Sequence, residues 1–267
     1  MSVAVDFQKD FIKHHRRQLW SKFIRAIKRY HLIEDGDRVA VAVSGGKDSM
    51  LLARMLQELT KHPLADFEVV PVAMDPGYAK ADQQQLKHLA HQLSVPLKIV
   101  KKELFRVVNE KAPDDPCYLC ARMRRGILYE IAENEGCNKL ALGHHYDDVI
   151  ETTLLNVFFS GSFKTMLPRI PSDNYESIEL IRPLYFIREA HIAALYERHN
   201  LDAMDCACTV ASGERPSKRE DIKQLIKQLR EEHKDIDRSI FNAAQNVNLD
   251  YVLGYTKAGR RYRPFED

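Results

Sequence analysis

A short apolar run that ends in a glycine turn constrains the fold of this chain more than any other stretch. Residues 38–43 read Arg-Val-Ala-Val-Ala-Val, and residues 44–49 read Ser-Gly-Gly-Lys-Asp-Ser. A run of valine and alanine is typical of a strand that is buried on both faces of a parallel sheet. Residues 50–56, Met-Leu-Leu-Ala-Arg-Met-Leu, are strong helix formers. The sequence therefore predicts a strand, a tight turn and a helix, in that order.

This arrangement suits the binding of an anion. Glycine lets backbone N–H groups approach a ligand closely, and the helix N-terminus adds a partial positive charge. Ser44 and Ser49 can donate hydroxyl hydrogen bonds, and Lys47 adds a full charge. A carboxylate such as Asp48 fits beside an anion if Mg²⁺ lies between them. The loop does not match the Walker A pattern, and the simpler alternative is a tight turn with no chemical role.

The sequence of residues 44–49 resembles the PP-loop of the N-type ATP pyrophosphatases. This resemblance implies a loop that holds the pyrophosphate end of ATP. It also implies that ATP is cleaved between its α and β phosphates, which leaves an adenylated substrate.

Strand-like and helix-like patterns alternate over the following residues. We predict further strands at residues 67–74, 97–100 and 139–143, and a helix over residues 81–93. This order indicates an α/β fold: a doubly wound, mostly parallel sheet with helices on both faces and with extra helices at both ends. The resemblance to the PP-loop enzymes implies a sheet like that of the adenine nucleotide α-hydrolases. Ligands of such sheets bind at the carboxyl ends of the strands. We therefore expect the nucleotide to contact Ala42, Ser44, Gly45, Gly46, Lys47, Asp48, Ser49, Met74 and Gly143.

The two ends of the chain have their own patterns. Residues 11–32 predict a helix with one apolar and one basic face, and the basic face either contacts RNA phosphates or is simply solvated. Residues 217–234 and 235–247 predict two further helices, and the basic, aromatic stretch at 259–264 is either an RNA contact or a disordered tail. We divide the chain into a basic helical segment (1–33), a PP-loop ATPase domain (34–205) and a C-terminal helical segment (206–267).

Composition narrows the class of protein. The chain has 267 residues and a formal net charge of +2, so its overall charge says nothing about a nucleic-acid partner. It has no apolar run of about 18 residues, the length that would predict a membrane span. Its first ten residues lack the apolar core of a signal peptide, so we expect a cytoplasmic protein. Five cysteines in a reducing compartment indicate metal ligands or reactive thiols rather than disulfides.

Four of the cysteines form two pairs. Cys117 and Cys120 lie at a predicted helix start, and an arginine-rich stretch follows at 122–126. Cys206 and Cys208 form the second pair. Four thiolates could hold zinc, three could hold an iron–sulfur cluster with one open iron, and the first pair alone could be a redox or persulfide pair. Cys137 stands apart, and we interpret it as structural.

A third cluster of polar residues follows the predicted strand at 139–143. Residues 143–152 read Gly-His-His-Tyr-Asp-Asp-Val-Ile-Glu-Thr and open the next helix. Negative charge in a first helical turn is stabilising by itself. Alternatively, a carboxylate such as Asp147 lies near Mg²⁺ or the adenylate. Zinc binding by His144 and His145 is not favoured, because adjacent side chains at a strand end diverge.

Together these motifs resemble the tRNA 2-thiocytidine synthetase (TtcA) family. The resemblance rests on residues 44–49, on Cys117 and Cys120 with 122–126, and on 143–152. Residues 181–184 (Ile-Arg-Pro-Leu), Arg188 with Glu189, and 245–247 (Gln-Asn-Val) are also similar.

The resemblance implies an ATP- and Mg²⁺-dependent tRNA-cytidine 2-sulfurtransferase. Such an enzyme adenylates O2 of a cytidine at position 32 of the anticodon loop, and sulfur then displaces AMP to give 2-thiocytidine. The family also implies a 4Fe-4S cluster on three cysteines, a sulfur donor of unknown identity and a homodimer. Catalytic roles then fall to Lys47, Asp48, Cys117, Cys120 and Asp147. The cluster ligands would be Cys117, Cys120 and Cys208.

This sequence departs from the family at the third cluster ligand. The family shows Pro-Cys-x-x-Cys, whereas residues 205–208 read Asp-Cys-Ala-Cys, so Cys206 is the alternative to Cys208. Other functions also stay open. These are a PP-loop adenylating enzyme with structural zinc, thiolation of another RNA position or of a small molecule, and a non-catalytic metal- and RNA-binding protein. The intact pair of Lys47 and Asp48 argues against the last of these.

Overall fold

A computed structural model describes residues 3–111, 116–172, 174–175, 177–204 and 218–266. Contacts divide the chain into two compact units. The first comprises Met1–Asp148 with Leu167–Arg215, and the second comprises Val149–Met166 with Pro216–Asp267. The division into three segments that we drew from the sequence stays a prediction.

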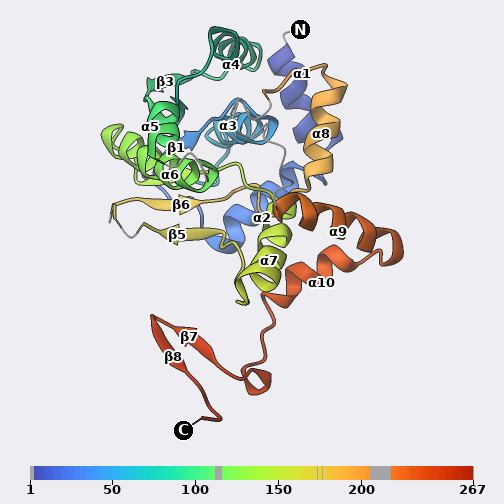
Figure 1. The fold of residues 1–267 in the computed structure, drawn as a ribbon. Helices are drawn as coiled ribbons and strands as arrows, with labels where there is room; N and C mark the ends of the chain where they lie inside the picture. Colours follow the sequence, from blue (N-terminus) through green and yellow to red (C-terminus); the bar gives the residue numbers. More distant parts are fainter. Residues whose placement is uncertain (1–2, 112–115, 173, 176, 205–217, 267) are drawn as a thin grey trace. The chain divides into compact units, whose positions relative to one another are not determined.

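The first unit is built on a six-stranded sheet of order β3-β2-β1-β4-β6-β5 (Figure 1). Five strands run parallel and the edge strand β5 is antiparallel to β6. Every strand predicted from sequence is present, with ends shifted by one or two residues, and the predicted fold class is confirmed. β5 and β6, of three residues each, were not predicted. The strands are β1 (Arg38–Ala42), β2 (Glu68–Asp75), β3 (Lys98–Lys101), β4 (Lys139–Ala141), β5 (Arg169–Pro171) and β6 (Glu179–Ile181).

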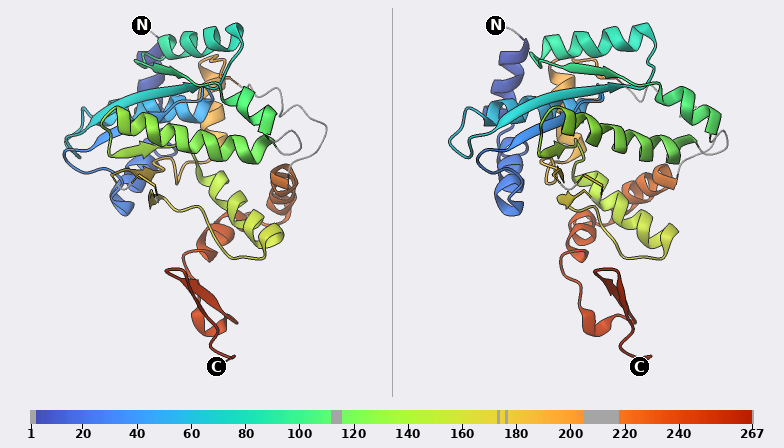
Figure 2. Two further views of the ribbon diagram at one scale, coloured as in Figure 1. Left: turned by 60° about the vertical axis from the view of Figure 1, so that its left-hand side comes forward. Right: turned by 90° about the vertical axis from the view of Figure 1, so that its left-hand side faces the viewer.

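Helices cover both faces of this sheet because the chain winds in two directions from β1. It first runs outward to β3 through α3 (Lys47–Leu59) and α4 (Lys80–Gln92). It then returns to β4 through α5 (Leu104–Lys111) and α6 (Pro116–Asn134). Right-handed crossovers in opposite directions put the two helix pairs on opposite faces, as Figure 2 shows for α3 and α6. The switch point between β1 and β4 is where such folds bind ligands.

The core lies on both faces of the central strands. Val39, Ala40 and Val41 of β1 are fully buried, which confirms the prediction of a doubly covered strand. Helix α3 is buried along most of its length. On the opposite face, apolar side chains of the strands pack with those of α5 and α6, among them Val72, Leu104, Val108, Ile131 and Leu140.

The prediction of one continuous helix over residues 11–32 is wrong. The chain forms α1 (Val3–Lys9), a π-helical turn (Asp10–His14) and, after a further turn, α2 (Trp20–Tyr30). The break buries Phe7, Phe11 and Trp20 together. It also places the buried carboxylate of Asp10 within hydrogen-bonding distance of a ring nitrogen of His15, 2.9 Å, and of His199, 3.0 Å. Helix α8 (Glu189–Arg198) precedes His199 directly.

The second unit contains most of α7 (Tyr146–Ser160) and the C-terminal elements. The two helices predicted there are confirmed as α9 (Lys218–Glu232) and α10 (Ile236–Ala243). A short 3₁₀ helix, η2 (Leu249–Tyr251), leads to a hairpin of β7 (Tyr255–Lys257) and β8 (Arg260–Tyr262). The alternative of a disordered tail at 259–264 is therefore wrong. The turn between the strands has positive φ at Ala258 and Gly259, 49° and 76°, the conformation that tight hairpins require.

Within the part of the chain that the structure describes, none of the helices is long and apolar enough to span a membrane.

Candidate active site

The glycine turn at 44–49 joins β1 to α3 at the switch point of the sheet. Gly45 has φ +90°, a conformation that favours glycine, and a Cβ there would overlap the side chain of Met204. The backbone of Met204 also donates a hydrogen bond to the carbonyl oxygen of Gly45, 3.1 Å. Gly46 caps α3 with ordinary extended backbone angles. Gly45 is therefore the position at which this loop needs a glycine.

Two serines hold the loop in shape. The Ser49 hydroxyl accepts a hydrogen bond from the backbone N–H of Ser44, 3.1 Å, and donates one to the carbonyl oxygen of Gly46, 3.0 Å. The hydroxyl of Ser44 lies 3.1 Å from that of Ser49. In this structure the Ser49 hydroxyl thus bonds to the loop itself, whereas we had expected it to be available to an anion.

Gly143 brings the end of β4 against the start of α3. A Cβ at this position would lie 2.9 Å from the backbone nitrogen of Ser49 and 3.1 Å from its Cα. Any larger residue would push the helix N-terminus away from the strand. The structure thereby places Gly143 beside the loop, as we expected from the strand ends.

Lys47 points to a carboxylate that the sequence analysis had not included among the catalytic residues. Its Nζ lies 2.8 Å from Glu189 Oε1 and 3.6 Å from Asp48 Oδ2. Burial lowers the pKa of Lys47, but the hydrogen bond to Glu189 and the charge of Asp48 outweigh this effect, so the net shift is upward. The side chain is therefore a permanent cation at the mouth of the loop.

One carboxylate oxygen of Asp48 is buried without a hydrogen bond from any described residue. This oxygen is Oδ1, and His145 Nε2 lies 4.0 Å from it. Burial raises the pKa of Asp48, and the charges of His145 and Lys47 offset this only in part. An unsatisfied carboxylate oxygen beside an anion-binding loop fits a Mg²⁺ that takes its other ligands from phosphate and water. Within the described ranges, no group of three or more acidic, histidine or cysteine side chains could hold a metal without such help.

Asp147 and Asp148 both bond to backbone at this edge of the sheet. Asp147 Oδ2 accepts a hydrogen bond from the backbone N–H of Glu189, 2.8 Å, at the N-terminus of α8. Asp148 Oδ2 accepts one from the backbone N–H of His145, 2.9 Å. Asp147 thereby positions the residue that pairs with Lys47. In the sequence, Glu189 stands out only as part of a family motif, although its place at the start of a helix is a usable signal.

A narrow cavity of ≈ 40 Å³ lies beside the loop, between the ends of β1 and β2 and helix α6. Ala42, Ser44 and Met74, three of the expected nucleotide contacts, line it. Tyr78 and Arg124 also line it, and neither is among the nucleotide contacts expected from the sequence. The loop, the ends of β1 and β2 and α6 thus surround one recess, on the β2 side of β1.

The cysteine pairs are described only in part. Cys117 and Cys120 lie in the first turns of α6, as predicted, but the side chain of Cys117, and Cys206 and Cys208 altogether, lie outside the described residues. Cys120 is 8% exposed, and a guanidinium nitrogen of Arg124 lies 3.9 Å from its sulfur. A nearby guanidinium favours thiolate, which is the form that binds metals.

Cys137 behaves as the structural residue we predicted. It is buried in the core beside α6, and this burial raises the pKa of its thiol.

Basic side chains of α2 lie near Arg188, the residue that directly precedes α8. The guanidinium of Arg25 lies 4.1 Å from the centre of the Phe186 ring, and that of Arg188 lies 5.1 Å from the Tyr146 ring. Burial lowers the pKa of Lys22, and the charges of Arg25 and Arg188 lower it further. Arg188 directly precedes Glu189, the partner of Lys47. Contact between this face and RNA stays a prediction.

Comparison with known proteins gives consistent relatives. Residues 16–226 match the PP-loop domain family ATP_bind_3. The tRNA-cytidine(32) 2-sulfurtransferase of Geotalea uraniireducens (strain Rf4) is 39% identical over 86% of this chain and 91% of its own length. That of Geotalea daltonii is 40% identical over the same shares of both chains.

The fold is also found among solved structures. The U34-tRNA thiolase NcsA from Methanococcus maripaludis, solved with its 4Fe-4S cluster, superposes with a TM-score of 0.68. The two sequences are 23% identical, and the match covers 89% of this chain and 80% of the other.

Proposed function

Because the chain belongs to the PP-loop domain family and to the family of the tRNA-cytidine(32) 2-sulfurtransferases, we propose that it replaces O2 of a tRNA cytidine by sulfur at the expense of ATP. The target is the cytidine at position 32, the position that the relatives' name gives. The products are 2-thiocytidine, AMP and pyrophosphate.

The observation that carries the proposal is the buried Oδ1 of Asp48, which accepts no hydrogen bond from any residue that the structure describes. It lies in a glycine turn at the switch point of the sheet, next to Lys47. Such a carboxylate is costly to the fold unless a cation satisfies it. Magnesium bound to the phosphates of ATP is a cation that this loop could accept.

Adenylation solves a problem of leaving groups. A carbonyl oxygen on cytosine leaves poorly, so O2 first attacks the α phosphorus of ATP, and the bond from that phosphorus to pyrophosphate breaks. Lys47 and the backbone N–H groups of residues 45–49 would stabilise the charge that develops on pyrophosphate. Asp48 would hold Mg²⁺, and Glu189 keeps the Lys47 side chain in the site before ATP arrives. In the second step AMP departs with O2 as the new bond from sulfur to C2 forms.

Cys117, Cys120 and Cys208 would hold a 4Fe-4S cluster, whose chemistry is to bring sulfide to the activated base. The guanidinium beside Cys120 supports a metal-binding role, because it favours thiolate. A structural neighbour that carries such a cluster supports the same assignment. The remaining parts of the proposal are a sulfur donor, a homodimer and a cytoplasmic location.

The base of an anticodon loop is unpaired, so it can be turned out into a pocket without breaking a base pair. The recess between β1, β2 and α6 is lined by three of the expected nucleotide contacts, Ala42, Ser44 and Met74. The arginine-rich stretch of α6 provides positive charge near it for the phosphates of RNA.

The test begins with protein that is purified without oxygen. We would record its visible spectrum and assay iron, acid-labile sulfide and zinc together, then incubate it with tRNA, Mg²⁺-ATP and sulfide. Mass spectrometry of the digested tRNA measures 2-thiocytidine. Four irons per chain that are lost in Cys117→Ala, with 2-thiocytidine at position 32, are expected. One tightly bound zinc and no thiolated product would contradict the proposal and favour a different adenylating reaction with a structural metal.

A further inference from the structure

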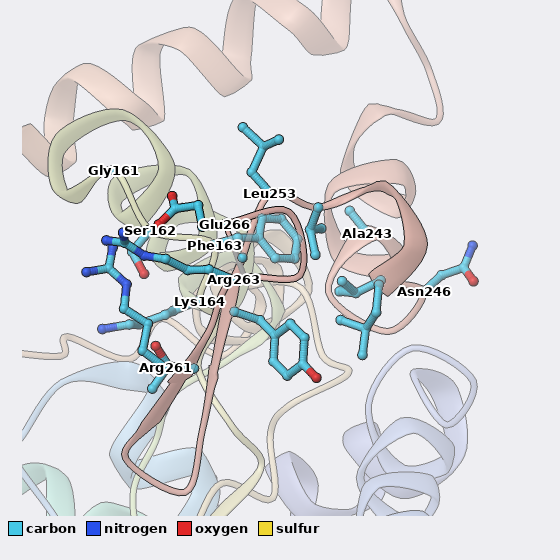
Figure 3. Close-up of a pocket in the computed structure, with 16 residues that line it drawn as sticks. Gly161, Ser162, Phe163, Lys164, Ala243, Asn246, Leu253, Arg261, Arg263 and Glu266 are labelled. Carbon is cyan, nitrogen blue, oxygen red and sulfur yellow. Dashed lines mark hydrogen bonds and ion pairs between the residues drawn. The ribbon is translucent and has the colours of Figure 1, made fainter.

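The second unit contains a cavity of its own, with a volume of ≈ 780 Å³. Its walls come from the loop that follows α7, the end of α10 and the segment from η2 through the β7–β8 hairpin (Figure 3). Of the candidate active-site residues that the structure describes, none lines it. A cavity of this volume is within the range of small-ligand sites, about 300–1,000 Å³.

The walls of this cavity are apolar and aromatic. Phe163, in the loop after α7, is 51% exposed, and Leu253 is 85% exposed. Tyr255 of β7 also lines the cavity, and its ring is stacked on Tyr262 of β8, with centroids 4.9 Å apart and planes 12° apart. The hairpin therefore holds one aromatic ring rigidly beside the cavity, and the loop supplies a second.

One side of the cavity is strongly basic. In Figure 3 the charged ends of Lys164, Arg261 and Arg263 lie together on one side of Phe163. Among the described residues that line the cavity, Glu266 is the one acid, and it pairs with Arg263. The lining thus has an excess of two positive charges beside apolar walls.

We propose that this cavity binds unpaired nucleotides of the RNA substrate, at a distance along the chain from the PP-loop. Bases would stack on Phe163 and Tyr255, and the phosphates between them would contact Lys164, Arg261 and Arg263. Aromatic faces next to cations are the combination that single-stranded RNA-binding surfaces use. The identity of the polyanion as RNA rests on the proposed function.

A second copy of this chain is the competing occupant, because exposed apolar walls also suit a protein partner. Burial against protein would remove three cations from water with one acid to compensate them, and unpaired buried charge is costly. RNA supplies the missing negative charge from its own backbone. The charge of the lining therefore favours RNA.

The test uses the full-length protein and a fluorescein-labelled single-stranded RNA hexanucleotide, with binding followed by anisotropy over a range of salt concentrations. Arg261→Ala should lower the slope of log K against log salt by about 0.7, the value for one lost phosphate contact on single strands. Arg260→Ala is the matched control. Arg260 adjoins Arg261 in β8, but its guanidinium lies over the Tyr262 ring at 5.6 Å and it does not line the cavity.

The aromatic wall of the cavity is tested by a variant of Phe163 and a matched control variant. Phe163→Ala should weaken binding of the hexanucleotide about tenfold, because one stacked base is lost, and Phe163→Trp should retain it. Phe158→Ala is the control, because Phe158 is 57% exposed in the same unit and does not line the cavity. Retention of binding by the tryptophan variant separates stacking from a folding defect.

Two results would overturn the inference. One is equal loss of binding in the cavity variants and their controls. The other is a change of oligomeric state in Phe163→Ala, measured by light scattering, with unchanged RNA binding, which would assign the cavity to a second copy.

Binding is measured without ATP, so it does not depend on thiolation. If the unmodified protein makes no 2-thiocytidine but its cavity variants lose RNA binding, the inference about the cavity holds and the proposed function is rejected. If the unmodified protein makes 2-thiocytidine and the cavity variants bind RNA normally, the proposed function holds and the inference about the cavity is rejected.

Discussion

Gly45 and Gly46 are adjacent and chemically identical, yet only the backbone of Gly45 requires a glycine. Gly45 has a positive φ and faces Met204, whereas Gly46 has φ −71°, and a Cβ added there would lie 3.5 Å from its nearest neighbour, Ser44 Oγ. Gly45→Ala should therefore destabilise the protein by at least about 2 kcal/mol. Gly46→Ala should cost about 1 kcal/mol or less, the loss of a good helix cap.

Urea unfolding measures both variants. Equal destabilisation would mean that the positive φ and the contact with Met204 do not decide the stability of the loop.

The ionised side chain of Asp48 should lower the stability of the folded protein and yet be essential for the formation of AMP. Its Oδ1 is buried without a partner among the described residues, so replacing the charge should not lower the melting temperature. The same change should reduce AMP formation about 100-fold or more, because one electrostatic contact to the transition state is lost. Asp48→Asn, assayed for AMP formation and by thermal melting, tests both halves. A variant that melts lower and stays active would refute the assignment.

At the scale of elements, Asp10 ties the N-terminal segment to α8. Its carboxylate lies 3.0 Å from Arg198 Nε and within hydrogen-bonding distance of His15 and His199. Burial raises the pKa of Asp10, but the hydrogen bonds from His15 and His199 and the charge of Arg198 outweigh it, so the net shift is downward. A lowered pKa in the folded state means that the ionised carboxylate stabilises the fold above the unfolded value of about 3.9. This contribution disappears as the pH falls through the lower folded value.

Asp10→Asn should therefore cost about 2 kcal/mol at pH 7, and the difference from the unmodified protein should shrink below pH of about 4. Chemical unfolding at several pH values measures it. Asp6→Asn is the control, because it changes the same charge in the neighbouring helix α1. A constant difference across the pH range would rule out a role for the ionised carboxylate.

Some helices and strands can be predicted from the spacing of apolar residues, and others cannot. β1 and α3 follow directly from composition, because an apolar run of valine and alanine and a run of helix formers leave few alternatives. The break in the N-terminal helix could not be predicted from the same pattern, because it depends on partners of Asp10 more than 180 residues away in the sequence. β5 and β6 have three residues each, too few for a periodic signal.

The candidate site shows the same division. Gly45, Lys47 and Asp48 were predictable, because motif and neighbouring elements agree. The pairing of Lys47 with Glu189 joins residues that lie 142 positions apart, so it required the fold. The hairpin at 255–262 was missed because its turn, Ala258–Gly259, lacks the usual asparagine or aspartate before glycine.

At the scale of the whole molecule, nucleotide binding should appear as stability. A ligand that binds only the folded state stabilises it by about 2.7 kcal/mol when its concentration is 100 times the dissociation constant. For a chain of this size, that corresponds to a rise of roughly 5–10 °C in melting temperature. We expect Mg²⁺-ATP to cause this rise in the unmodified protein, and ATP with a chelator of Mg²⁺ to cause much less.

Two variants show which site causes the rise in melting temperature with Mg²⁺-ATP. Asp48→Asn should start at an equal or higher melting temperature and lose the response to Mg²⁺-ATP, because the metal loses its protein ligand. Arg261→Ala, in the second unit, should keep the full response, since its role concerns RNA. Differential scanning calorimetry compares the three proteins at one nucleotide concentration. An undiminished response in Asp48→Asn would move the magnesium site away from the PP-loop, whereas a reduced response in Arg261→Ala would mean that the cavity of the second unit and the nucleotide site are energetically coupled.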